Sequence, residues 1–214
     1  MAGSLYDATW GRAFAAGYDR VLMRAERAGL AGMRGELLAA ATGRTIELGA
    51  GTGLNLAHYP KAVTELVLTE PFAPMAARLR SRVRSAGVDA DVVEAPGERL
   101  PFPDASFDTV VFTMILCTAP DPPAVLAEAA RVLKPDGRLL FLEHVRSDAP
   151  RLARWQDRLE TPWRWFGHGC HCNRRTAELI EASPLVAERL ERGMIPGAVP
   201  LVKPMLVGSA RRGG

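Results

Sequence analysis

The stretch TIELGAGTGLN, residues 45–55, places three glycines within five residues, directly after a short apolar run. Turns of this kind bind nicotinamide and flavin cofactors, nucleoside triphosphates and S-adenosylmethionine, so the glycines alone leave the ligand open. A P-loop requires Lys and then Ser or Thr after its last glycine, whereas Leu54 follows Gly53 here. A G-x-G-x-x-G dinucleotide motif read from Gly49 and Gly51 would need its third glycine at position 54. Neither motif fits the turn.

Two glutamates narrow the choice of ligand. Glu47 directly precedes the turn, and Glu70 stands at the end of the next β-rich run, ELVLTE, residues 65–70. A pyrophosphate requires N–H donors, whereas a cationic sulfonium with an amino-acid tail favours nearby carboxylates. An acidic side chain at the tip of the second strand also accepts the hydroxyls of a ribose. A tight turn between two solvated glutamates is the alternative, but the combination favours S-adenosylmethionine as cofactor.

The composition is that of an ordinary globular domain. The 214 residues are 48% hydrophobic and 24% charged, and the formal net charge of +3 is too small to indicate a nucleic-acid partner. Three cysteines, an odd number, favour a reducing compartment. No apolar run reaches the roughly 18 residues of a membrane span, and the N-terminus lacks the apolar core of a signal peptide. We expect one cytoplasmic domain over residues 1–214 without stable membrane insertion; its oligomeric state is left open.

Helical and strand-like patterns alternate along the chain, which predicts an α/β fold with a mostly parallel sheet. Pro135 and Gly137 are expected to end the third helical region. The segment 147–182 reads as helical and irregular. The predicted helical regions are 11–41, 75–87 and 123–137, and the predicted strands are 44–48, 65–70, 89–95, 108–116, 138–145, 185–195 and 200–211.

Four stretches carry a family resemblance: ELGAGTG, LVLTEP, GERLPFPDASFDTVV and EAARVLKPDGRLLFLEHV, within residues 44–145. With them the chain resembles the class I S-adenosylmethionine-dependent methyltransferases, especially the type 11 branch that includes the ubiquinone/menaquinone methyltransferases. The resemblance implies a Rossmann-like fold with a seven-stranded, mostly parallel sheet, helices on both faces and an antiparallel last strand. It also implies a helical lid over residues 1–41, a cofactor-binding core over 44–145 and a substrate-side insert over 147–182.

The resemblance also assigns the cofactor contacts. The three glycines of the turn would line the methionine part of the cofactor, Glu70 would hold the ribose, and Gly97 and Glu98 would flank the adenine. Many members have Asp where this chain has Pro96, so the adenine contact is expected from Glu98 or from backbone. The candidate cofactor-binding residues are Glu47, Gly49, Gly51, Gly53, Glu70, Pro71, Gly97, Glu98 and Thr113.

The insert is rich in aromatic residues. Leu152, Trp155, Leu159, Trp163 and Phe166 recur at helical spacing, and Pro162 after Thr161 is suited to the start of a new helical turn. We expect most of this stripe to pack against the sheet. Aromatic side chains also line apolar ligand pockets, and a position against a bilayer surface is a further alternative. The candidate substrate-binding residues are Tyr18, Trp155, Trp163 and Cys170.

The insert extends the resemblance to the alkyl-thiol methyltransferases of the endoplasmic reticulum. Those proteins have, in this order, a Glu-His-Val run, a Trp-Gln pair, a Pro-Trp pair and a Gly-Cys pair. Here these fall at residues 143–145, 155–156, 162–163 and 169–170. The chain departs from that group in lacking its N-terminal membrane anchor. The resemblance implies a thiol as methyl acceptor.

The sequence GHGCHC, residues 167–172, raises the question of a metal site, because His168, Cys170, His171 and Cys172 are soft-metal ligand types. Zinc sites usually combine a C-x2-4-C pair with a second, distant pair, and this chain has one crowded cluster instead. Adjacent ligands in one loop cannot easily point at one ion. We therefore expect no metal, and we expect Cys117 to be a small buried hydrophobic residue.

His144 is the candidate general base, because it ends strand 138–145 at the edge of the sheet where this fold places its chemistry. A structural histidine beside Glu143 is the alternative.

The sequence thus predicts a methyltransferase for a small, fairly apolar acceptor. A thiol is favoured, followed by O- or C-methylation of a phenolic or quinone-type molecule. A non-catalytic S-adenosylmethionine-binding protein is the rival hypothesis. Methylation of RNA is disfavoured, because residues 151–182 hold six arginines against four acids and no basic-aromatic platform.

Overall fold

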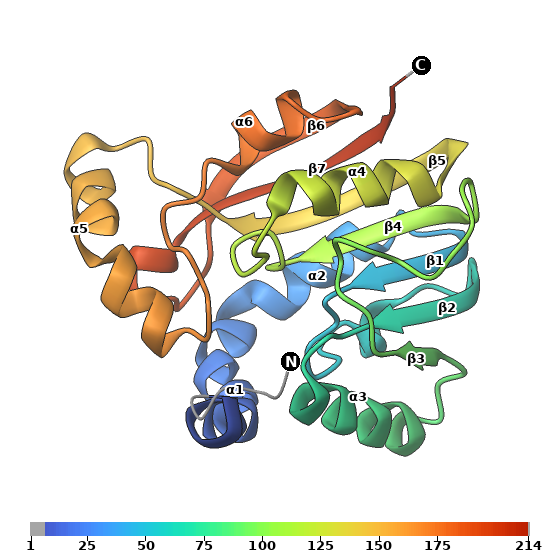
Figure 1. The fold of residues 1–214 in the computed structure, drawn as a ribbon, viewed down its shortest axis with the longest axis horizontal. Coiled ribbons are helices and arrows are strands. Elements are labelled where there is room, and N and C mark those ends of the chain that lie inside the picture. The colour runs from blue at the N-terminus through green and yellow to red at the C-terminus, as the bar shows by residue number, and fades with distance from the viewer. Residues whose placement is uncertain (1–6, 214) are drawn as a thin grey trace.

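One seven-stranded sheet organises the computed structural model, which describes residues 7–213 (Figure 1). Its strands are β1 (Gly43–Leu48), β2 (Val63–Thr69), β3 (Asp91–Val93), β4 (Phe107–Thr113), β5 (Leu133–His144), β6 (Leu185–Met194) and β7 (Pro204–Arg212). They lie in the order β3-β2-β1-β4-β5-β7-β6. The first five strands pair in parallel, and β7 lies antiparallel to both β5 and β6. The predicted mostly parallel sheet with an antiparallel last strand is confirmed.

Helices cover both faces of the sheet. Val125 of α4 packs in one apolar cluster with Phe112 of β4, and Leu37 of α2 packs with Leu140 of β5 on the opposite face. Figure 1 shows α4 in front of the sheet. The α-helices are α1 (Arg12–Ala25), α2 (Ala31–Leu38), α3 (Ala73–Ala86), α4 (Pro122–Val132), α5 (Pro150–Phe166) and α6 (Thr176–Glu181), with shorter turns η1 (Asp7–Gly11), η2 (Glu26–Leu30), η3 (Leu56–His58) and η4 (Pro200–Val202).

The strand order reverses between β1 and β4. From β1 the chain moves outward to β2 and β3, and it then returns to place β4 on the other side of β1. Ligands of open α/β sheets bind outside the carboxyl ends of the strands at such a reversal. In Figure 1 these strand ends point toward the side of the molecule where α1 and α5 lie. The fold thus places the glycine turn after β1 at the edge where a ligand binds.

The predicted boundary between the third helical region and the fifth strand is wrong. Helix α4 ends at Val132 and not at Gly137, and β5 already begins at Leu133. Pro135 disfavours the helical conformation for Lys134, so the helix stops before the proline. The strand pairing is irregular after Leu133. Phe107 pairs with Leu133, whereas Thr109 pairs with Arg138, so the register of β5 against β4 shifts between these two pairs.

Smaller differences concern the other strands. The predicted strand 89–95 is shortened to β3, and strand 108–116 ends at Thr113, where Met114 adopts a positive φ of 60°. The predicted strand 200–211 begins with the helical turn η4. The helical regions 11–41 and 75–87 are confirmed, with Gly29 (φ 135°) interrupting the first and Gly87 capping the second.

The insert differs most from expectation. Helix α5 continues through Pro162 instead of beginning a new turn there. Its buried side chains are Ala153 and Gln156, whereas Trp155 and Phe166 are 50% and 58% exposed. The aromatic stripe therefore does not pack against the sheet, and α5 stands beside the strand ends (Figure 1). Within residues 7–213, no helix is long and apolar enough to cross a membrane.

The side-chain amide of Gln156 anchors helix α5 to its neighbours. The Gln156 Nε2 donates to the carbonyls of Val145, Cys172 and Leu201 at 3.1, 2.8 and 2.8 Å, and its Oε1 accepts from the Ser147 N–H at 2.8 Å. A buried side chain with every polar group bonded fixes its neighbours strongly. Gln156 thereby joins the end of β5, the loop after α5 and η4.

Candidate functional site

The glycine turn after β1 is shaped by left-handed backbone. A Cβ at Gly49 would lie 2.9 Å from Ile115 Cδ1, and one at Gly53 would lie 2.8 Å from Leu79 Cδ1. Packing therefore requires glycine at both positions. Gly51 has a φ of 58° as well, but a Cβ there would find no atom nearer than Met75 Sδ, at 3.9 Å. The backbone at Gly51 is thus open on the side where a ligand can approach.

Glu70 lies directly against this turn. Its Oε2 accepts from the Gly51 N–H and its Oε1 from the Phe72 N–H, both at 2.9 Å. Burial raises the pKa of Glu70, and the two backbone donors oppose this rise. Each carboxylate oxygen keeps a further lone pair after these bonds. Glu70 is therefore fixed in place and still able to accept ligand hydroxyls, as predicted for a ribose.

Glu47 lies beneath the turn, in a buried polar network. Its oxygens accept from Asn55 Nδ2 at 2.8 Å and from the Tyr59 hydroxyl at 2.7 Å. Asn55 Nδ2 also donates to Thr113 Oγ1 at 3.0 Å, and Asn55 Oδ1 accepts from Arg34 Nη1 at 2.9 Å. The network ties α2, β1 and β4 to the turn. It gives Glu47 and Thr113 a structural role; a direct contact of either with the cofactor stays a prediction.

The remaining cofactor candidates surround the same edge. Gly97 is buried, and a Cβ there would touch Ile115 and Val125 at 3.4 Å. Glu98 Oε1 accepts from the Asp121 N–H at 3.3 Å, so its carboxylate stands at the N-terminus of α4. Pro71 is exposed directly after Glu70. Their contacts with adenine or ribose stay predictions.

Helix α1 closes over the turn through residues that the sequence reasoning missed. Asp19 of α1 accepts from the Thr52 hydroxyl at 2.5 Å and forms an ion pair with Arg82 of α3. One carboxylate therefore bridges the lid, the turn and the next helix. Asp19 lies in a predicted helix without a local motif, so no signal in the sequence distinguishes it from other exposed acids.

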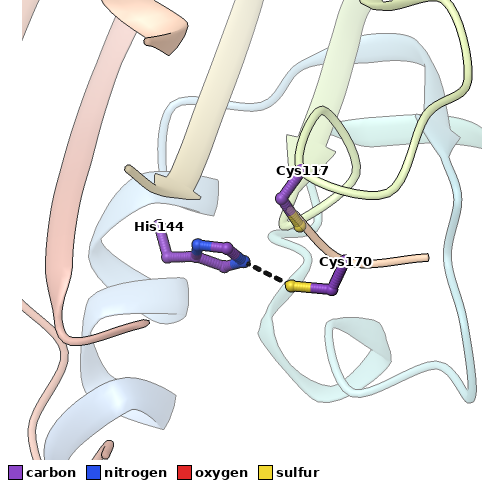
Figure 2. A group of neighbouring side chains, drawn as sticks. All are labelled: Cys117, His144 and Cys170. Carbon is purple, nitrogen blue, oxygen red and sulfur yellow. Dashed lines mark hydrogen bonds between the residues drawn. The ribbon is translucent and has the colours of Figure 1, made fainter. Parts of the chain in front are cut away.

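Three side chains from separate elements meet beyond the end of β5 (Figure 2): Cys117 from the turn after β4, His144 at the end of β5, and Cys170 from the loop after α5. Their ligand atoms lie within 4.8 Å of one another, and His144 Nε2 is 3.1 Å from Cys170 Sγ. Figure 2 shows the imidazole pointing toward Cys170. Trp163 Nε1 also donates to Cys170 Sγ at 3.3 Å.

The cluster polarises its own thiols. The hydrogen bond from Cys117 lowers the pKa of Cys170 well below the ordinary thiol value, and the charge of His144 lowers it further. The same bond raises the pKa of Cys117. Burial lowers the pKa of His144, but Cys170 and Glu143 together raise it. Cys170 is therefore the more acidic of the two thiols, and it lies beside a histidine whose pKa is raised.

Tyr18 lies between the cluster and the glycine turn. Burial raises its pKa, Arg34 opposes this, and the charges of Cys117, Cys170 and Glu70 raise it further. The charges of both the cluster and Glu70 thus act on the Tyr18 hydroxyl. His144 and Trp163 both contact Cys170, and the substrate-binding role of Tyr18, Trp163 and Cys170 stays a prediction. Trp155 lies two turns earlier on α5 and is half exposed, so its role in substrate binding stays a prediction.

An aromatic wall that the sequence analysis missed borders this space. His168 stacks on Phe14 of α1 at 5.4 Å and lies tilted against Phe72 at 4.5 Å, both measured between ring centroids. Phe14 in turn contacts Tyr18 at 5.5 Å. These residues come from three distant segments, so their meeting depends on the tertiary fold and not on a local motif. They place ring faces against one another between α1, the start of α3 and the loop after α5.

The structure does not bring the four soft ligand types of residues 168–172 together. Of the four soft ligand types in residues 168–172, only Cys170 reaches the cluster. His168 stacks in the aromatic wall, His171 Nδ1 lies 2.7 Å from Glu160, and Cys172 is buried against the Gln156 carbonyl. Cys117 is buried as expected, but it faces Cys170 and His144 as well. Among residues 7–213, Cys117, His144 and Cys170 form the one group able to hold a metal ion.

Comparisons with known proteins agree with this geometry. Residues 46–141 match the family described as "Methyltransferase domain". The chain is 36% identical over 169 residues to the thiol S-methyltransferase TMT1B of Rattus norvegicus, covering 77% of this chain and 69% of that protein. It is 35% identical over 119 residues to the ubiquinone/menaquinone biosynthesis C-methyltransferase UbiE of Vibrio cholerae, covering 53% and 46%.

The fold has close counterparts among solved structures. A SAM-dependent methyltransferase of Thermotoga maritima superposes with a TM-score of 0.69 at 20% identity, covering 94% of this chain and 97% of the other. The open backbone at Gly51 and the fixed carboxylate of Glu70 suit a cofactor that carries a ribose beside an amino-acid tail. The chain therefore belongs to the class I methyltransferases, with S-adenosyl-L-methionine as its cofactor.

Proposed function

We propose that this enzyme methylates the sulfur of a small, fairly apolar thiol. The observation that carries the proposal is the meeting of Cys117, His144 and Cys170 beyond the end of β5, at the edge of the sheet that also holds the glycine turn and Glu70. The relatives named as thiol S-methyltransferases support it. A reducing cytoplasm suits both such an acceptor and the three unpaired cysteines.

The residues divide the work between two groups at the carboxyl edge of the sheet. When bound, S-adenosylmethionine supplies an electrophilic methyl group on a sulfonium, which becomes a neutral thioether once the methyl group has left. Glu70 and the glycine turn would hold this cofactor. The aromatic wall of Phe14, Phe72 and His168 would position the acceptor. Alignment of two reactants in this way lowers the activation free energy of the transfer, by about 7–11 kcal/mol in the best cases.

The protonation state of the acceptor decides whether the protein must supply a group that removes a proton. A thiol has a pKa of about 8.5, so only a few per cent is thiolate at neutral pH. The sulfur forms its new bond to carbon after the S–H bond has broken, and the product is a neutral methyl thioether. A polarised cluster of thiols and imidazole is suited to removing that proton. A phenol or a quinone-type carbon would require no such sulfur-binding group.

A panel of acceptors of matched size tests this function. We expect an alkyl or aryl thiol to yield a methyl thioether by mass spectrometry, at a rate well above that of the corresponding alcohol, phenol or amine. A preference for phenols or for a quinone-type carbon would support the C- or O-methylation that the likeness to UbiE suggests. Cofactor binding without turnover of any acceptor would favour a non-catalytic protein.

The cofactor contact of Glu70 can be tested separately. Replacing Glu70 by alanine should weaken S-adenosylmethionine binding by about 1.5–3 kcal/mol, the range for a hydrogen bond to a charged group. Isothermal calorimetry measures this, and Glu181→Ala, an exposed glutamate of α6, is the matched control. Equal affinities in two folded variants would remove Glu70 from the cofactor site.

A further inference from the structure

The donor set of the Cys117, His144 and Cys170 cluster is that of a metal site. Two thiol sulfurs and one imidazole nitrogen converge from three separate segments of the chain, with Cys117 and His144 buried and Cys170 partly buried (Figure 2). Zinc is bound by such ligands, and catalytic zinc sites combine three protein ligands with one open position. The carboxylate-free, sulfur-rich set excludes hard ions such as Mg²⁺ and Ca²⁺.

The distances suit one ion after small adjustments. Zinc–sulfur bonds of about 2.3 Å and zinc–nitrogen bonds of about 2.0 Å place tetrahedral ligand atoms about 3.5–3.8 Å apart. In the structure all three atoms lie within 4.8 Å, and the nitrogen is 3.1 Å from Cys170 Sγ. Side-chain rotations that move each atom by about an ångström would therefore bring them to one centre.

The surroundings hold each ligand in place. Glu143 Oε1 accepts from the Ile115 and Leu116 N–H groups at 2.9 and 3.2 Å, which fixes the turn that carries Cys117. The Trp163 indole donates to Cys170 Sγ at 3.3 Å. Hydrogen-bond donors around a metal site orient the metal-bound thiolates and reduce the negative charge density on their sulfur atoms. The position of His144 is set by the end of β5, where it pairs with Met205 of β7.

We propose that Cys117, His144 and Cys170 bind one Zn²⁺ ion, whose fourth position takes the sulfur of the acceptor thiol. The second half of this proposal rests on the proposed function, whereas the first half does not. On binding, the acceptor's S–H bond breaks, its proton passes to solvent and a sulfur–zinc bond forms. A thiol bound to zinc is deprotonated at neutral pH.

The methyl transfer that follows forms one bond and breaks one bond. The bound thiolate sulfur forms a bond to the methyl carbon as the sulfonium's bond to that carbon breaks. The product is a neutral thioether, which binds zinc more weakly than a thiolate and dissociates. In this arrangement His144 is a ligand, and zinc takes over the task expected of a general base. The sulfur preference of the ion explains why a thiol acceptor would be selected over an alcohol.

Metal content of the purified full chain is the first test. After incubation with Zn²⁺ and removal of free ion, elemental analysis should find about one zinc per chain. Cys117→Ser, His144→Ala and Cys170→Ser should each lower zinc affinity at least tenfold, measured by competition with a chromogenic chelator. Cys172→Ser is the matched control, because this neighbouring buried cysteine lies outside the cluster. Calorimetry with S-adenosylmethionine shows that each variant is folded.

Cobalt substitution reports on the ligands directly. The Co²⁺ form of the protein should show thiolate-to-cobalt charge-transfer bands and the strong visible bands of tetrahedral coordination, both reduced in the Cys117 and Cys170 variants. An alkyl thiol should change this spectrum, and the corresponding alcohol should not. A spectrum that ignores the thiol would overturn the acceptor's role as fourth ligand.

The outcomes separate this proposal from the proposed function. Zinc binding at trace level, or zinc binding that is equal in wild type and Cys170→Ser, would overturn the metal site. Thiol methylation by metal-free protein would overturn the ion's role in the transfer while leaving the proposed function intact. Normal zinc binding together with methylation of phenols alone would contradict the thiol function and leave the metal site standing.

Discussion

Replacing Gly51 by alanine should weaken S-adenosylmethionine binding about tenfold to a hundredfold, the equivalent of roughly 1–3 kcal/mol of overpacking. The added Cβ would meet no protein atom closer than 3.9 Å, so it would project into the open space that we propose for the cofactor. The positive φ of 58° adds backbone strain of about 1–2 kcal/mol to the folded state. The fold should therefore survive while the cofactor is excluded.

Gly87 supplies the matched control for this variant. It has the same left-handed backbone, with a φ of 63°, and a Cβ there would have open space around it. Gly87→Ala should show a similar fall in stability by urea unfolding and an unchanged affinity for the cofactor by calorimetry. If both variants bind S-adenosylmethionine equally, the space in front of Gly51 is not the cofactor site.

The second large effect is expected at Arg34, whose guanidinium is 4% exposed between Glu26 and Asn55. Replacing Arg34 by methionine keeps the length of the side chain but leaves two buried partners without their cation. Breaking a buried ion pair from one side destabilises a protein by about 3–5 kcal/mol. Urea unfolding at pH 7 should show this loss, and Arg27→Met, an exposed arginine of η2, should stay within about 0.5 kcal/mol of wild type.

The deficit of Arg34→Met should also depend on pH. Burial raises the pKa of Glu47, and Arg34 is one of the groups that oppose the rise. Without Arg34 this pKa rises further, so the folded variant binds a proton more readily than the unfolded chain. Its stability relative to wild type should therefore recover as the pH falls from 8 toward 5. A deficit that is constant across this range would mean that Glu47 does not respond to Arg34.

The sequence predicts the cofactor side of the molecule because that side is built from local motifs. The glycine turn, Glu70 and the strands around them lie within one continuous stretch, and the glycine spacing together with the two glutamates favours S-adenosylmethionine. The network of Arg34, Asn55 and Tyr59 escaped prediction, since its members are far apart in sequence and share no pattern. They meet only because β1, β4 and α2 pack together.

The acceptor side could be predicted only in part, for the same physical reason. Cys170 and His144 were singled out from motifs, but Cys117 was assigned to the core because burial and ligation look alike in sequence. Helical periodicity placed the tryptophans of α5 against the sheet. The helix is instead held by the polar side chain of Gln156, so periodicity of apolar residues gave the wrong face.

Gln156 has a consequence for how new specificities can arise. Its hydrogen bonds hold the acceptor-side segments to one another and to the end of β5, and none of them reaches the glycine turn or Glu70. Substitutions within residues 146–176 that leave His168 and its contact with Phe72 in place can therefore change the proposed acceptor side while cofactor affinity is inherited unchanged. Descendants of such a chain would diverge in what they methylate long before they diverge in the methyl donor that they use.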